Sequence, residues 1–71
     1  MINIGQRIKE ELTCQERTVS WLARKINCNR SGIYRIFDKN SIDTSLLEKI
    51  SVALNHNFME ELSDVVKQKL N

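Results

Sequence analysis

Apolar residues recur three and four positions apart in five stretches of the chain, the spacing that gives an α-helix one buried face. This pattern predicts helices over about residues 3–13, 18–26, 29–38, 44–54 and 58–70. The residues expected to face the core are Ile4, Ile8, Leu12, Val19, Leu22, Ala23, Ile26, Cys28, Ile33, Ile36, Phe37, Leu46, Leu47, Ile50, Ala53, Leu54, Phe58 and Leu62. The sequence therefore predicts a single all-α domain that spans residues 1–71.

Capping residues set the predicted helix boundaries, because the chain has no proline and only two glycines. The residues expected to cap helix N-termini are Asn3, Thr18, Asn29 and Asn57. Asn57 is followed by Glu60 at the spacing of a capping box. Asn27 and Asn55 are expected to end helices, because asparagine tolerates a positive φ better than most residues.

A very short connection separates the second predicted helix from the third, and Ala23 supplies the small side chain that a steep crossing of two helices needs. The third helix is predicted to expose a set of polar side chains rich in groups that hydrogen-bond base edges. These residues are Asn29, Arg30, Ser31, Tyr34, Arg35 and Asp38. The pair of helices is therefore predicted to be a helix-turn-helix.

The net charge of +2 is distributed unevenly along the chain. Residues 1–35 carry seven Lys or Arg against three Glu, whereas residues 36–71 carry four Lys against six acids. Five cations and no acid lie between Arg17 and Phe37. This basic region is expected to attract a polyanion, and the alternative is a solvated basic face without a partner.

The residue types argue against other classes of function. The chain lacks a close carboxylate pair, a glycine-rich phosphate loop and a cysteine with a plausible histidine partner, so we do not expect an enzyme. Cys14 and Cys28 are expected to be small reduced hydrophobes, and His56 a loop residue, so no metal, cofactor or small-molecule ligand is predicted. With no apolar run long enough for a membrane span and no signal peptide, the expected location is cytoplasmic.

The segment from Leu22 to Ile33, LARKINCNRSGI, resembles the helix-turn-helix of the phage repressor and Cro superfamily. The helix from Asn3 and the later segments 42–47 and 50–54 resemble the other helices of its compact five-helix, lambda-repressor-like domain. The resemblance implies sequence-specific binding of double-stranded DNA and control of transcription in a bacterium or phage. Two positions depart from the family pattern: Asn27 stands where glycine is usual, and Val19 follows Thr18 where glutamine is common.

Chemistry assigns roles to the residues of this predicted interface. The base-reading residues are expected to be Arg30, Ser31, Tyr34 and Arg35, with Arg30 paired to guanine through two hydrogen bonds. The residues expected to contact phosphates and position the domain are Arg17, Thr18, Asn29, Lys39, Asn40 and Ser41. The alternatives are that the arginines only solubilise the helix, that Tyr34 covers the edge of the core, and that Trp21 partly covers it.

The resemblance further implies a repressor that acts by occupying its operator, because 71 residues leave no room for an effector domain. Such proteins usually bind as dimers, and Val65, Val66 and Leu70 of the last helix form the expected pairing surface unless they complete the core. The alternative function is a protein-interaction module, such as an antitoxin or adaptor. Trp21 and the acidic last third of the chain favour that alternative.

Overall fold

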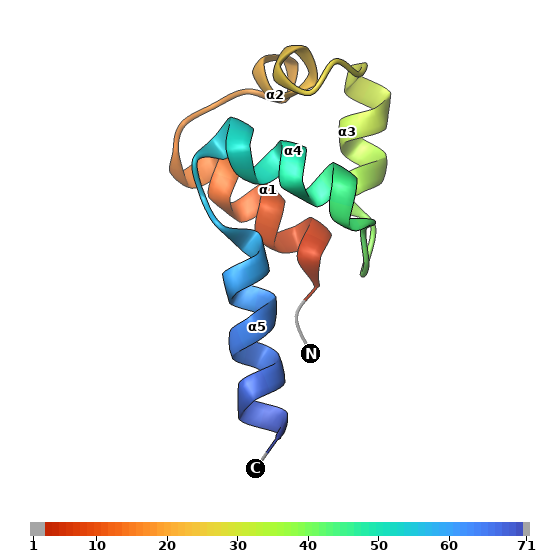
Figure 1. The fold of residues 1–71 in the computed structure, drawn as a ribbon. Coiled ribbons are helices and arrows are strands. Elements are labelled where there is room, and N and C mark those ends of the chain that lie inside the picture. Colours follow the sequence, from red (N-terminus) through yellow and green to blue (C-terminus); the bar gives the residue numbers. More distant parts are fainter. Residues whose placement is uncertain (1–2, 71) are drawn as a thin grey trace.

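A computed structural model describes residues 3–70, and their regular structure is entirely helical (Figure 1). The helices are α1 (Ile4–Cys14), α2 (Val19–Lys25), α3 (Arg30–Phe37), α4 (Thr44–Leu54) and α5 (Phe58–Lys69). No strand occurs in this range, and none of its helices is long and apolar enough to cross a bilayer. The prediction of an all-α, five-helix protein is confirmed, and each helix end lies within one residue of its predicted position.

Each helix begins at a polar side chain that accepts a hydrogen bond from the backbone N–H three residues later. These N-caps are Asn3, Thr18, Asn29, Asp43 and Asn57. The four predicted N-caps are confirmed, and Asp43 is a fifth N-cap that was not predicted. Each such cap is worth about 1 kcal/mol, because it satisfies a backbone donor that the helix itself leaves free.

Three helices end at a residue with positive φ, which turns the chain away from the helix axis. Asn27 (φ 57°) and Asn55 (φ 50°) confirm the predicted stops after α2 and α4, and Glu16 (φ 58°) ends α1 in the same way. At Asn27 the Schellman pair of hydrogen bonds forms, with Cys28 N–H donating to the Ala23 carbonyl at 2.8 Å. Glu16 was not predicted, because glutamate has no particular preference for this conformation.

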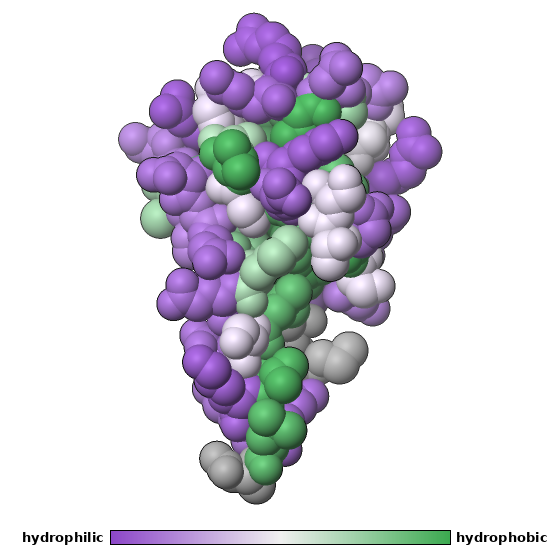
Figure 2. All heavy atoms as spheres, in the orientation of Figure 1, coloured by the Kyte–Doolittle hydropathy of each residue, from purple (hydrophilic) through white to green (hydrophobic). Residues whose placement is uncertain are grey.

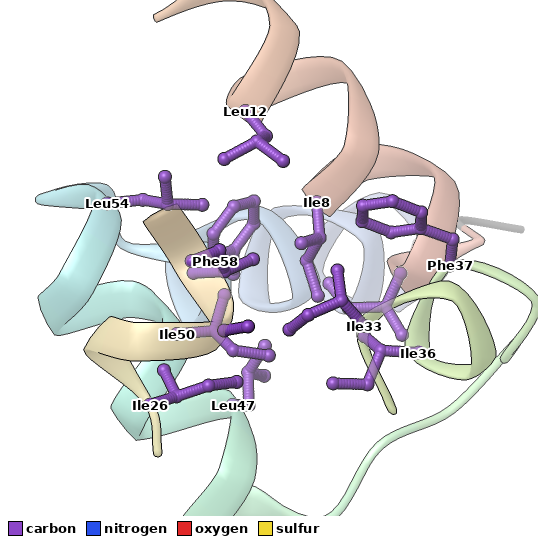
Figure 3. Packing of buried hydrophobic residues seen from close by; sticks show 13 residues of the cluster. Ile8, Leu12, Ile26, Ile33, Ile36, Phe37, Leu47, Ile50, Leu54 and Phe58 are labelled. Carbon is purple, nitrogen blue, oxygen red and sulfur yellow. The ribbon is translucent and has the colours of Figure 1, made fainter. Parts of the chain in front are cut away.

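All five helices contribute side chains to one apolar core (Figure 3). The buried side chains are Ile4, Ile8, Leu12, Leu22, Ala23, Ile26, Ile33, Ile36, Phe37, Leu47, Ile50, Leu54 and Phe58. Val19, Leu46, Ala53 and Leu62 pack on this core while only partly buried, as does Trp21, which confirms its predicted role as a partial cover. The prediction that Cys28 faces the core is wrong, because this residue lies exposed in the turn between α2 and α3. Cys14 is exposed as well.

Helix α5 leaves the bundle after its first turn and projects beyond it (Figure 1). Phe58 is its one fully buried residue. Because the rest of the helix extends beyond the bundle, the described chain measures 41 Å in one direction and about 20 Å in the others. Val66 (55% exposed) and Leu70 (77% exposed) therefore do not complete the core, and Val65 is only partly covered. Figure 2 shows the resulting apolar band along the outer part of the helix.

A polar cluster fixes the base of α5 against α1. The Arg7 guanidinium donates from Nε to Glu61 Oε1 at 2.7 Å and from Nη2 to Glu61 Oε2 at 3.1 Å. This pairing lowers the pKa of the Glu61 carboxyl, and the same hydrogen bonds raise the pKa of Arg7. His56 lies in the loop between α4 and α5, as predicted, and it also joins this cluster. It contacts Glu61, and its Nδ1 lies 3.8 Å from Glu11.

Candidate nucleic-acid interface

Helix α3 lies along one edge of the molecule (Figure 1), and it has one apolar and one polar face. Its inner face consists of Ile33, Ile36 and Phe37, which are all buried. The opposite face carries the predicted base-reading residues, and all of them are exposed. They are Arg30, Ser31, Tyr34 and Arg35, which form two rows of residues four positions apart. The structure therefore brings this predicted set together on one helix face.

The guanidinium groups of Arg30 and Arg35 differ from that of Arg7 in their surroundings. Arg7 is engaged by Glu61 and, through Nη1, by Glu10 at 2.6 Å. Within residues 3–70, neither Arg30 nor Arg35 forms an ion pair, and both side chains are exposed. The two arginines on α3 are thus free to hydrogen-bond an acceptor outside the chain.

Tyr34 has two environments at once. Its ring meets Phe37 edge to face, with the ring centroids 6.1 Å apart, and the residue remains 54% exposed. The ring therefore covers one edge of the core, as the alternative interpretation holds, while enough of the side chain stays accessible for an external contact.

The N-caps of α2 and α3 keep donor groups available for a phosphate. Thr18 Oγ1 accepts the Trp21 N–H at 3.0 Å, and Asn29 Oδ1 accepts the Gly32 N–H at 2.7 Å. Each cap uses only the acceptor of its side chain, so the Thr18 hydroxyl hydrogen and the Asn29 amide group can still donate. Both residues are exposed, in keeping with the predicted positioning role.

The loop after α3 is anchored to the start of α1. Gly5 N–H donates to the Lys39 carbonyl at 3.0 Å, and Asn3 Nδ2 donates to Asn40 Oδ1 at 2.9 Å. Lys39, Asn40 and Ser41 are exposed, so these predicted phosphate contacts lie on a loop held at two points. The carbonyl oxygen of the Asn40 side chain is already engaged, which leaves its amide group to donate.

Gly5 allows α1 to approach the end of α3 at a distance that no other residue permits. A Cβ atom at this position would lie 2.3 Å from the Ile36 carbonyl oxygen and 2.6 Å from that of Phe37. Both obstacles are backbone atoms, so a larger residue would have to separate the helices. This contact was not predicted from the sequence, although Gly5 shares the helical spacing of Ile8 and Leu12 on the inner face of α1.

Arg17 is placed differently from the other predicted positioning residues. Its guanidinium lies 4.7 Å from the centroid of the Trp21 ring, and Lys25 approaches the same ring at 5.6 Å. This cation–π contact is not evident from the sequence, because it depends on how the chain enters α2.

Comparison with protein-family models, with curated proteins and with solved structures found no match to this chain.

Proposed function

We propose that this chain binds double-stranded DNA in a sequence-specific manner, with α2 and α3 acting as a helix-turn-helix and α3 entering the major groove. The observation that carries the proposal is the exposed face of α3, where two arginines that have no carboxylate partner within residues 3–70 stand beside Ser31 and Tyr34. Arginine pairs with guanine O6 and N7 through two hydrogen bonds, and each such pair discriminates against a wrong base by about 1–3 kcal/mol.

The supporting geometry concerns how α3 is held. The Schellman turn at Asn27 leaves four residues between α2 and α3, and α2 packs against α3 with Ala23 buried. The Thr18 and Asn29 caps and the loop of Lys39 to Ser41 then offer donors to the phosphates on either side of the groove. In this proposal the protein acts as a repressor, because a domain seated on an operator excludes other proteins from it.

A selection from a random duplex pool tests the proposal. We expect the purified chain to enrich a defined motif that contains guanine, and the affinity for that motif to fall steeply with salt, by a slope of roughly −0.9 per phosphate neutralised. The retained duplexes are sequenced, and the binding constant of the enriched site is measured across a salt series. If the retained DNA shows no motif, sequence-specific recognition is refuted even where salt-sensitive binding remains.

The projecting part of α5 is the proposed pairing surface of a homodimer. Val66 and Leu70 are exposed and lie four residues apart, so they share one side of the helix, and the partly covered Val65 lies beside Val66. The first half of α5 holds Glu60, Glu61 and Asp64, and its second half holds Lys67 and Lys69. Antiparallel pairing of two such helices would bury the apolar side and place each acidic half beside a basic half.

A charged substitution in this surface tests the dimer. We expect the chain to self-associate at micromolar concentration and Val66→Glu to weaken association at least about tenfold, since it buries a charge without a partner. Gln68→Glu, which adds the same charge to an exposed polar position, is the control and should associate like the parent. Sedimentation velocity over a concentration series makes the measurement, and a parent that stays monomeric throughout excludes this interface. If the dimer forms, the selected DNA should contain two inverted half-sites about 34 Å apart.

A further inference from the structure

A groove lies on the surface between α2 and α4, and none of the proposed DNA-contacting residues lines it. Its volume is about 600 Å³. Trp21 and Lys25 of α2 form one side, and the other side consists of Glu48, Lys49, Val52 and Ala53 of α4. A cavity of this size on a small domain is large enough to accept side chains from another molecule.

The groove contains apolar surface that the chain itself does not cover. Val52 is 75% exposed although it lies in the last turn of an amphipathic helix, and Ala53 beside it is only partly buried. Trp21 packs on the core with one part of its ring and presents another part to the groove. A partly exposed tryptophan and an exposed valine facing one depression are typical of a protein-binding surface, because burial of both would stabilise a complex.

The charge of the groove indicates what kind of protein would fit. The Lys25 ammonium and the Arg17 guanidinium are both held over the Trp21 ring, and Lys49 stands on the α4 side. Glu48 is the one acid of its lining. The two lysines of the lining outnumber its single carboxylate, so the groove is complementary to an acidic partner, and the Trp21 ring holds Lys25 in place before binding.

We infer that this groove binds an acidic amphipathic helix of a partner protein. Apolar side chains of that helix would pack on Trp21 and Val52, and flanking carboxylates would pair with Lys25 and Lys49. Duplex DNA is a poorer fit, because a sugar-phosphate backbone offers no apolar side chain to the exposed valine. The inference is independent of the proposed DNA contacts, since the exposed residues of α3 do not line the groove.

Trp21 is the only tryptophan of the chain, so its fluorescence reports directly on this groove. The probe is a library of helical peptides with apolar residues at i, i+4 and i+7 and random residues at the flanking positions. We expect selection on the folded chain to enrich peptides with acidic flanks. Titration of an enriched peptide should change the Trp21 emission and saturate.

Charge-reversed variants locate the binding. In the double variant with Lys25→Glu and Lys49→Glu we expect at least a tenfold loss of peptide affinity. The control double variant, with Lys9→Glu and Arg24→Glu, makes the same charge change at exposed positions outside the groove and should lose less than threefold. Circular dichroism checks that all variants fold. Arg30→Ala should leave peptide affinity unchanged, because Arg30 does not line the groove.

Several outcomes would overturn the inference. Enrichment of peptides with basic or uncharged flanks, or no saturable change in emission with any selected peptide, shows that the groove does not bind an acidic helix. Equal losses in the two double variants show a dependence on net charge alone. If duplex DNA changes the Trp21 emission and the Lys25 and Lys49 substitutions abolish that change, the groove belongs to a nucleic-acid surface instead.

Discussion

Replacing Gly5 with alanine is expected to lower the free energy of unfolding by at least about 3 kcal/mol, because overpacking commonly costs 1–3 kcal/mol and the Gly5–Lys39 hydrogen bond would be lost as well. The added Cβ would meet the carbonyl oxygens of Ile36, Phe37 and Lys39 at 2.3, 2.6 and 2.7 Å, and none of these backbone atoms can rotate away. A domain of this size rarely has more than roughly 3–5 kcal/mol from its core. Thermal unfolding followed by circular dichroism should show a midpoint lower by more than about 12 °C, or no folded baseline.

Gly32 provides the matched control for this prediction. A Cβ there would lie 3.3 Å from Asn29 Oδ1 and 3.4 Å from Cys28 Sγ, which belong to exposed side chains that can shift. Gly32→Ala should change stability by less than about 0.5 kcal/mol, and the better helix propensity of alanine offsets part of the crowding. A midpoint for Gly5→Ala that matches the midpoint for Gly32→Ala would show that α1 and α3 are not in the tight contact described above.

Loss of Arg30 is expected to weaken binding of the selected DNA site by roughly 5- to 150-fold, which corresponds to the 1–3 kcal/mol of a two-bond contact to guanine. Arg35→Ala should have an effect of similar size, and the two changes together should weaken binding by at least about 25-fold if the side chains contact separate groups. Because both side chains are exposed and lack an ion-pair partner within residues 3–70, neither change should destabilise the fold. Fluorescence anisotropy with the labelled site measures the affinities.

The mode of each contact is read from the specificity and the salt dependence. An arginine that reads a base should, once removed, relax the preference at one position of the site, whereas one that contacts a phosphate should reduce the salt slope by about 1. Lys9→Ala removes the same charge from the exposed surface of α1 and should weaken binding less than threefold. If Lys9→Ala and Arg30→Ala weaken binding equally, α3 does not carry the recognition and the proposed interface is wrong.

The helices were predictable because their signals are local. A cap such as Asn29 bonds a backbone N–H three residues away, and a stop such as Asn27 depends on the conformational tolerance of its own side chain. The spacing of the apolar residues then placed the exposed face of α3, so the candidate interface was assembled from one helix and its flanking residues. Glu16 escaped prediction because the conformation of this residue is imposed by the packing around it.

Contacts between distant parts of the chain were not predictable in the same way. Gly5 meets residues more than thirty positions later, and Arg7 pairs with Glu61 across the sequence. The position of Cys28 between apolar residues predicts a core residue. The left-handed conformation of Asn27 just before it turns the Cys28 side chain outward instead. The groove beside Trp21 likewise depends on how α2 and α4 pack, which no periodicity within either helix reveals.

The attachment of α5 through Phe58 and the Arg7–Glu61 pair divides the chain into regions that open with different free energies. A helix of twelve residues is marginal on its own in water, so the turns beyond Glu61 depend on whatever covers their apolar side. In the isolated chain their amide hydrogens should exchange far faster than those of the bundle. A global unfolding measurement on dilute protein would therefore scarcely detect the part of α5 beyond Glu61. The helical order of that part would depend instead on protein concentration and on assembly.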